Sequence, residues 1–387
     1  MQVPEFYEFH CPVKTNAGIN ALDHIPIELE AMDARKPLII TDKNTYSKGI
    51  IKHVASAFSE SGIVLGVFDG VGDTADISTI RDLYQRWQYK GIDSIIAVGS
   101  GAVLDTAKGL NIAVSGKPED LRKNAESIKT RLKPLVAVLT GYSNGFEISK
   151  YAFIGELTFT SPFLMPDLVV VDPRMVRSES ALRIAETAMI TFSHAAEAIT
   201  HASKNPLSDC YAYAALEYIR HCLMEALKNP KDKKSCLALA EASSMAGCAF
   251  SNSRFGMVHE LGQEIAKQRL LSSGQAMGIL LPYGIEYQTL KCGFQAADML
   301  IPLVGFNDFV DTPQNQRNQK VLSLIRQMQD NICSTVQLPR TFKDVQIEKE
   351  KLKKVAQKVA ESSSSGIRED AYLTVLNAAY DGKPIMG

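Results

Sequence analysis

Three features are scarce or missing in this sequence: closely paired cysteines, long apolar runs, and an excess of one charge. The seven cysteines are an odd number, are widely spaced and form no C-x-x-C pair. We therefore expect reduced thiols in a cytoplasmic protein, and neither a disulfide framework nor a zinc knuckle. No uncharged apolar run approaches the length of a membrane-spanning helix. The N-terminal residues MQVPEFYEFHCPV also lack the basic start and apolar stretch of a secretory signal.

Charge is balanced along the whole chain. The 42 Lys and Arg residues face 43 Asp and Glu residues, which gives a formal net charge of -1 at pH 7. A global basic excess that would hold nucleic acid or an anionic membrane is therefore missing. The sequence predicts neither a nucleic-acid partner nor a membrane partner.

What the chain does contain is enough apolar sequence for two folded domains. Its 387 residues are long for one domain, and 45% apolar with 22% charged residues is ordinary globular composition. The N-terminal half alternates helical patterns with short apolar runs at 37–42, 63–71, 94–101, 134–141 and 167–173. Runs of this kind, closed by turn residues and separated by helices, predict a parallel α/β sheet.

From about Ser178 the pattern becomes helical. Ala, Leu, Glu and Met recur at helical spacing, and strand-like runs are almost missing from this half. The sequence thus predicts an α/β domain over residues 1–175 and an all-helical domain over 176–387. The polar segment ESSSSG at 361–366 is expected to be a loop before a short helical tail.

A strand-to-helix junction carries glycines at 94–110. The apolar run SIIAV ends in Gly99-Ser100-Gly101, and a helical pattern follows. Glycines there let backbone N–H groups approach an anion, and the helix start adds a positive partial charge. A pyrophosphate is the natural ligand, but a plain tight turn explains the glycines equally well, because Leu104 stands where G-x-G-x-x-G requires a glycine.

Asp42 ends the apolar run PLIITD. A carboxylate at such a position accepts hydrogen bonds from a ribose 2′-OH and repels a 2′-phosphate, which would favour NAD over NADP. The simpler alternative is an aspartate that caps a turn.

Together these segments resemble the iron-containing (group III) alcohol dehydrogenase family of the dehydroquinate-synthase-like superfamily. The family's G-G-G-S-x-x-D-x-x-K turn stands here as residues 99–108, its P-T-T-x-G-T-G-S-E segment as 139–147, and its P-x-x-x-x-x-D-P stretch as 166–173. Its D-A-L-x-H-A-x-E-A helix resembles 190–198, its G-x-A-F-S-N segment is 247–252, its V-H is Val258-His259, and its L-L-P is 280–282.

The resemblance implies an N-terminal Rossmann-like domain that holds NAD(P) and a C-terminal helical domain that holds a divalent metal, Fe or Zn. It implies hydride transfer between a small-molecule alcohol and an aldehyde or ketone, in a homo-dimer or larger homo-oligomer. Together with the argument for Asp42, it assigns cofactor binding to Gly99, Ser100, Gly101, Asp105, Thr140, Tyr142 and Gly145.

The metal-ligand set departs from the family pattern, which uses one Asp and three His. His194 and His259 match two of these positions, but Ile190 and Ser273 replace the Asp and the third His. Two neutral imidazoles leave a cation's charge uncompensated, and hard divalent ions prefer oxygen ligands. We expect that the usual metal is lost, unless Glu197 or Glu260 swings in to replace the missing ligands.

A metal-free site needs another group to polarise the substrate carbonyl. Arg254 precedes His259 in a position where the family has a small residue, and a guanidinium can bind an oxyanion or a substrate carboxylate. The hypothesis is a metal-independent reductase of polar or anionic carbonyls, with Arg254 as electrophile or anchor and His194 or His259 as acid. The alternative is that Arg254 only forms a surface ion pair.

The nucleotide loop departs as well, because Tyr142 and Phe146 replace small residues. Their bulk would narrow the nicotinamide pocket, stack on a ring or block the cofactor, whereas simple gap-filling also explains Tyr142. A non-catalytic family member with a structural or sensing role is therefore the main competing hypothesis. A cyclase or lyase that uses NAD transiently is a third.

Overall fold

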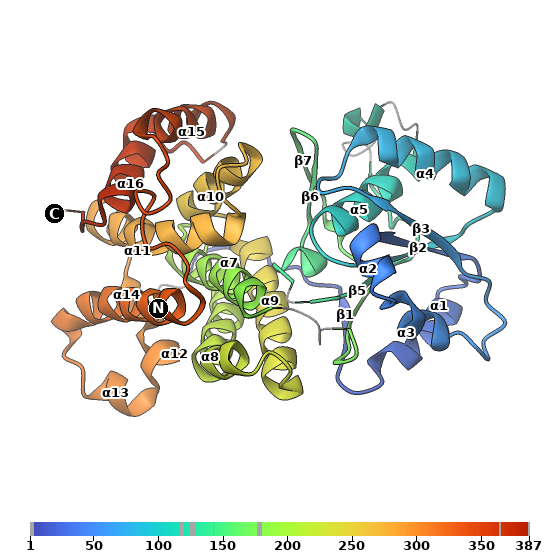
Figure 1. The fold of residues 1–387 in the computed structure, drawn as a ribbon, viewed down its shortest axis with the longest axis horizontal. Helices are drawn as coiled ribbons and strands as arrows, with labels where there is room; N and C mark the ends of the chain where they lie inside the picture. The colour runs from blue at the N-terminus through green and yellow to red at the C-terminus, as the bar shows by residue number, and fades with distance from the viewer. Residues whose placement is uncertain are drawn as a thin grey trace. The chain divides into compact units, whose positions relative to one another are not determined.

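The structure is a computed structural model, and it describes residues 4–116, 120–123, 128–141, 143–175, 180–363 and 365–385. The chain divides into two compact units, His10–Ser178 and Glu179–Gly387, and the N-terminal segment up to Phe9 groups with the second. Figure 1 shows the sheet-containing unit in blue to green and the helical unit in green to red. The predicted domains, 1–175 and 176–387, differ from these two units mainly because the prediction placed the N-terminal segment with the first domain.

A six-stranded sheet with every pairing parallel forms the centre of the first unit, in the order β1-β8-β5-β4-β2-β3. Its strands are β1 (Lys14–Ala17), β2 (Pro37–Asp42), β3 (Gly66–Val71), β4 (Ser94–Val98), β5 (Leu135–Val138) and β8 (Leu168–Val171). Every residue of β4, β5 and β8 is buried, because a parallel sheet covered on both faces has no polar side. The predicted α/β fold is confirmed.

Helices and one hairpin complete this unit. The helices are α1 (Ile25–Ala31), α2 (Lys43–Ser47), α3 (Ile51–Ser56), α4 (Ile77–Lys90) and α5 (Ala102–Val114). The antiparallel hairpin consists of β6 (Tyr151–Ile154) and β7 (Leu157–Thr160), which the sequence pattern did not indicate. Short 3-10 turns lie at Ala21–His24, Phe146–Ile148 and Pro162–Leu164.

The second unit is helical, as predicted: the strands of the described residues all end by Val171. Its helices are α7 (Ala181–Thr200), α8 (Pro206–Lys228), α9 (Lys233–Ser253), α10 (Met257–Lys267), α11 (Ser273–Lys291), α12 (Leu300–Val304), α13 (Phe306–Val310), α14 (Arg317–Val336), α15 (Lys349–Ser362) and α16 (Glu369–Asp381). Two 3-10 turns lie at Ala296–Met299 and Gln314–Gln316. The predicted loop 361–366 begins too early, because Glu361 and Ser362 still belong to α15; residues 363, 365 and 366 are not helical.

Glycines bring α11 close to α7 and α10. A Cβ atom on Gly274 would lie 2.5 Å from the Glu186 carbonyl oxygen of α7, and one on Gly262 of α10 would lie 2.5 Å from Cγ of Met277. Near the other end of α11, the Thr200 hydroxyl of α7 donates to the Gln288 side chain at 2.5 Å. The three helices therefore pack at a separation that larger side chains at these glycines would prevent.

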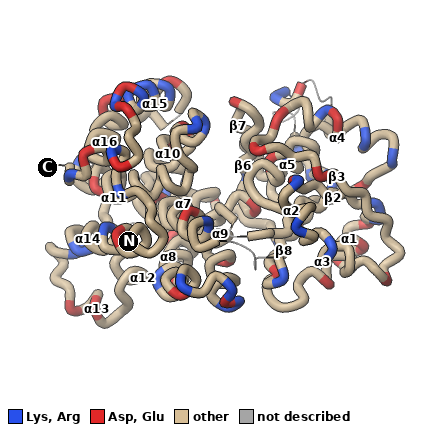
Figure 2. The backbone as a smooth tube through the Cα atoms, in the orientation of Figure 1, with Lys and Arg blue, Asp and Glu red and all other residues tan. Residues whose placement is uncertain are grey.

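Basic and acidic residues occur along the elements of both units (Figure 2), in keeping with the net charge of -1. Among the described residues, none belongs to a helix that is long and apolar enough to cross a bilayer.

Candidate active site

The glycine turn joins β4 to α5. Gly99 has φ 153°, and a Cβ atom there would lie 2.9 Å from Cγ2 of Val103, so both the conformation and the space require glycine. Gly101, with φ 52° and ψ -119°, is the N-cap of α5 and provides no side-chain cap. Ser100 between them is exposed. The Val103 N–H donates to the Ser100 carbonyl at 3.2 Å, and the other N–H groups at the start of a helix have no partner within it, which fits a pyrophosphate.

Asp42 caps the short helix α2. Its carboxylate accepts hydrogen bonds from the Thr45 N–H at 2.9 Å and the Thr45 hydroxyl at 2.8 Å. The capping interpretation is therefore what the local structure shows. Because β2 and β4 pair in parallel, Asp42 and Gly99 also end neighbouring strands at the same edge of the sheet. A contact between Asp42 and a ribose stays a prediction.

The motif groups Asp105 with the cofactor-binding residues, but its carboxylate lies in the interior of the unit. It accepts the Phe153 N–H at 3.1 Å, and burial raises its pKa to about 7 although the charge of Lys108 lowers it. Asp105 therefore links α5 to strand β6 inside the unit.

Lys108, one turn further along α5, is fully buried. Its ammonium donates to the carbonyls of Phe146 at 2.8 Å, Ser149 at 2.8 Å and Tyr151 at 2.7 Å. Burial lowers the pKa of Lys108 to about 8, while the charges of Asp105 and Glu147 raise it. Lys108 thus fastens the segment after Gly145 onto α5.

The segment after β5 contains the remaining predicted nucleotide residues. Thr140 is half-buried, and Gly145 has φ 87°, a left-handed conformation that favours glycine. Tyr142 lies outside the described residues. Phe146 is buried, with its ring 5.1 Å from that of Phe153 in an edge-to-face contact, so its bulk fills the interior of the unit.

Two histidines meet in the helical unit. His194 on α7 and His259 on α10 are both buried, and the distance from His194 Nε2 to His259 Nδ1 is 2.9 Å. Phe255 stacks on the His259 ring at 3.8 Å, and Phe250 packs edge-on against His194 at 4.7 Å. Burial lowers the pKa of His259 well below its usual value, and the nearby charges of His194 and Lys267 act in the same direction. His259 is therefore neutral at physiological pH.

This pair does not fit the metal that the family resemblance implies. The facing nitrogens hydrogen-bond to each other, and Ile190, one helical turn before His194, brings a buried apolar side chain. Ser273 is the half-buried first residue of α11. In the part of the chain that the structure describes, three or more His, Cys, Asp or Glu side chains nowhere form a group that could hold a metal ion.

The two glutamates considered as substitute ligands bind elsewhere. The Glu197 carboxylate accepts the N–H groups of Gly256, Val258 and His259. Glu260 faces away from the histidines and accepts the hydroxyls of Ser363 and Tyr372. Neither carboxylate is available to a metal at the histidine pair.

Arg254 ends α9 in the loop that carries Phe255. It is exposed, has φ 127° and ψ 172°, and its N–H donates to the Phe250 carbonyl at 2.9 Å. Its guanidinium forms no ion pair with any described residue, so the surface ion pair considered above is not observed. Its charge contributes, after burial, to a lowered pKa of His201.

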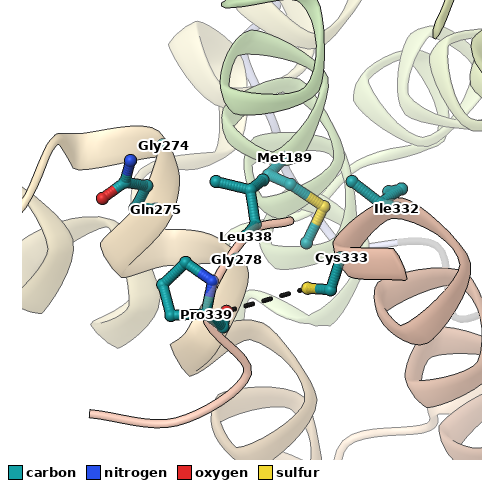
Figure 3. A pocket seen from close by; sticks show the side chains of 8 residues that line it. All are labelled: Met189, Gly274, Gln275, Gly278, Ile332, Cys333, Leu338 and Pro339. Carbon is teal, nitrogen blue, oxygen red and sulfur yellow. Dashed lines mark hydrogen bonds between the residues drawn. The ribbon is translucent and has the colours of Figure 1, made fainter. Parts of the chain in front are cut away.

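A small apolar pocket lies between α7, α11 and the end of α14 (Figure 3). Its cavity volume is about 10 Å³, and its lining residues are Met189, Gly274, Gln275, Gly278, Ile332, Cys333, Leu338 and Pro339. The Cys333 thiol donates to the Pro339 carbonyl at 3.7 Å. Substrate pockets are larger, roughly 300–1,000 Å³, with several convergent polar groups, so this pocket is not a candidate active site.

Sequence reasoning missed the supporting roles of Lys108 and Glu197, although it named Glu197 as a possible substitute ligand. Lys108 was visible as the last residue of the glycine motif, and Glu197 follows His194 by three residues on the same helix. Spacing alone placed Glu197 near His194. It did not indicate that the carboxylate would reach the backbone of α10.

Comparison with known proteins decides the family. The family model described as "Iron-containing alcohol dehydrogenase" matches residues 12–173, and "Fe-containing alcohol dehydrogenase family, C-terminal" matches residues 184–369. The chain belongs to the iron-containing alcohol dehydrogenase family. This confirms the predicted family and identifies the protein as an oxidoreductase of the alcohol dehydrogenase type.

Curated relatives share about a quarter of their residues with this chain. The choline dehydrogenase of Bacillus subtilis (strain 168) is 25% identical over 73% of this chain and 73% of its own length. The NAD-dependent methanol dehydrogenase of Bacillus methanolicus is 28% identical over 71% of this chain and 74% of its own length. Among solved structures, a 1,3-propanediol oxidoreductase superposes with a TM-score of 0.89 at 23% identity, over 97% of this chain and 100% of that chain. This likeness shows the same fold.

Proposed function

We propose that this family member transfers hydride between NAD(H) and a small alcohol or carbonyl compound without the metal that names the family. The observation that carries the proposal is the direct hydrogen bond between His194 and His259, in the place where a cation would otherwise be bound. Two ring nitrogens that bond to each other, at a place where the described residues offer no third metal ligand, suit proton transfer better than metal binding.

The glycine turn supports the cofactor part of the proposal. Gly99 and Gly101 leave the start of α5 open to a pyrophosphate, and Thr140 and Gly145 follow the neighbouring strand β5. The Asp42 carboxylate would repel a 2′-phosphate and so favours NAD over NADP. The nicotinamide, when bound, supplies or accepts the hydride.

The histidine pair would handle the proton. Reduction of a carbonyl adds a hydride to carbon and a proton to oxygen, and alcohol oxidation removes both. With one nitrogen of each ring engaged in the mutual hydrogen bond, a proton taken up at one outer nitrogen can leave from the other. The lowered pKa of His259 keeps a lone pair in the relay, which can accept the proton released in alcohol oxidation.

Arg254 is proposed as the anchor of a polar or anionic substrate. Its side chain is exposed, and the next residue, Phe255, stacks directly on His259. A non-glycine residue with φ 127° is strained, and strain of this kind is concentrated at functional sites. A guanidinium there would bind a carboxylate in a forked geometry or stabilise a developing oxyanion.

The test starts from protein treated with a chelator and checked by elemental analysis. NADH binding is measured by fluorescence, and turnover is measured with neutral and anionic aldehydes, ketones and alcohols. We expect turnover without metal and no gain on adding Fe²⁺ or Zn²⁺. We also expect a loss of about 10²–10⁴-fold in His194→Gln and His259→Gln. His53→Gln, an exposed histidine on α3, is the matched control. Activity that appears only with bound metal would show that metal independence is wrong.

A non-catalytic role is the second candidate. It is favoured by the replacement of two expected ligands by Ile190 and Ser273, which removes the family's usual electrophile. Protein that binds NADH but turns over no substrate would support this candidate. The cytoplasmic location and the homo-oligomeric state belong to the proposal as predictions, and light scattering of the purified chain measures the second.

A further inference from the structure

Glu197 forms a three-point contact with the start of α10. Its Oε1 accepts the Val258 N–H at 2.6 Å, and its Oε2 accepts the N–H groups of His259 at 3.1 Å and Gly256 at 3.3 Å. Glu197 is 1% exposed and belongs to α7, not to the loop that precedes α10. The N-terminus of α10 is therefore capped by a carboxylate from a neighbouring helix.

The contact involves the same two helices that bring the histidines together. His194 and Glu197 are three residues apart on α7 and share one face of that helix. The backbone N–H of His259 donates to Glu197, and its ring bonds to the ring of His194. α10 packs against α7 (Figure 1). Two neighbouring points on α7 thus fix one residue of α10, through its backbone and through its ring.

Gly256 leaves the space for this carboxylate. A Cβ atom on Gly256 would lie 2.4 Å from Oε1 and 2.7 Å from Cδ of Glu197. Its own backbone is extended, with φ -109° and ψ -169°, so any residue could adopt the conformation and only the space excludes a side chain. The local sequence is therefore fitted to the carboxylate from the side of α10 as well.

We propose that Glu197 is a positioning residue, whose carboxylate holds α10 so that His259 Nδ1 faces His194 Nε2 at hydrogen-bonding distance. The catalytic part of this inference rests on the proposed function, whereas the geometric part does not. A glutamine has one acceptor oxygen, and its NH₂ group would face backbone N–H groups. Glu197→Gln therefore keeps the shape of the side chain but cannot reproduce the three-point contact.

The experiment uses the full chain with ¹⁵N-labelled histidine. Ring-nitrogen chemical shifts, read through the carbon-bound ring protons, report which nitrogens carry protons and which accept hydrogen bonds. The spectra and kcat are both recorded at about pH 9, well above the ordinary pKa of a glutamate carboxyl. The His194→Gln and His259→Gln spectra assign the signals.

Glu197→Gln should shift the signals of both ring nitrogens towards those of isolated imidazoles. It should also lower kcat by roughly 10²-fold, because a displacement of about 1 Å at a reacting group has that effect. The KM for NADH should stay unchanged. Gly256→Ala should produce the same changes while it keeps the glutamate. Glu260→Gln is the matched control, because Glu260 is also a carboxylate on this helix pair but bonds to Ser363 and Tyr372.

The outcomes separate this inference from the proposed function. Unchanged histidine signals in folded Glu197→Gln and Gly256→Ala would overturn the positioning role, whatever the activity. A lower melting temperature with normal signals and kcat would leave Glu197 as an ordinary cap and would also overturn it. Changed signals in both variants, in a protein that shows no wild-type turnover, would support the positioning role and refute the proposed function.

Discussion

Replacing Lys108 by methionine should strongly destabilise the α/β unit. Methionine keeps the length and much of the volume of the side chain but removes the ammonium. The three carbonyls of Phe146, Ser149 and Tyr151 would lose a common donor in a place where the lysine is fully buried. The negative charges of Asp105 and Glu147 would also lose their nearby cation.

The magnitude follows from the balance of these effects. Hydrogen bonds to a charged group contribute about 1.5–3 kcal/mol each, but removing a buried ammonium also removes the free energy of its desolvation. Breaking a buried charge cluster by deleting one partner usually costs about 3–5 kcal/mol, and we expect a loss in this range. For a unit of this size, that corresponds to a fall in melting temperature of roughly 6–20 °C.

Differential scanning calorimetry of the full chain measures this loss, with Lys52→Met as the control. Lys52 is an exposed lysine on α3 in the same unit, so its replacement should change the melting temperature by at most a few degrees. Binding of NADH should weaken in Lys108→Met, because the segment that carries Gly145 is no longer fastened to α5. Equal melting temperatures for the two variants would refute the structural role assigned to Lys108.

Three further predictions concern the site. The pKa of His259 in the folded chain lies below its usual value of 6.5, so the unfolded chain binds more protons as the pH falls below 6.5, and the stability of the fold decreases there. His259→Gln should lack this loss of stability when melting temperatures are compared at about pH 7.5 and about pH 5.5. Gly99→Ala should weaken NADH binding by about tenfold or more, because Cβ would collide with Val103. The control variant Gly72→Ala should bind NADH normally, because the nearest atom would be 3.9 Å from its Cβ. Arg254→Gly should raise stability by about 1 kcal/mol through relief of backbone strain, and it should raise the KM of anionic but not of neutral carbonyls. The control Arg269→Gly, at a residue with φ 56°, should share only the gain in stability. An unchanged KM for anionic carbonyls in Arg254→Gly would show that Arg254 is not the anchor.

The local pattern of the sequence determined the family and most of the fold. The order of its motifs, the glycines between an apolar run and a helix, and the change to helical spacing near residue 178 are all read within short segments. The replacement of the expected aspartate by Ile190 is equally local, and it led to the expectation of a lost metal before any contact was known. The capping of α2 by Asp42 spans three residues and was one of the two interpretations offered.

Contacts between distant segments were decided by the tertiary structure. His194 and His259 are 65 residues apart, and their facing nitrogens depend on how α7 and α10 pack. Glu197 reaches the backbone of α10 across 59 to 62 residues, and Lys108 reaches carbonyls 38 to 43 residues away. Sequence spacing indicates which residues share a helix face, but the partner of a buried polar side chain is set by the packing of whole elements. For this reason the sequence identified the two histidines, while only the folded chain showed that they bond to each other and which carboxylate accepts the N–H groups at the start of α10.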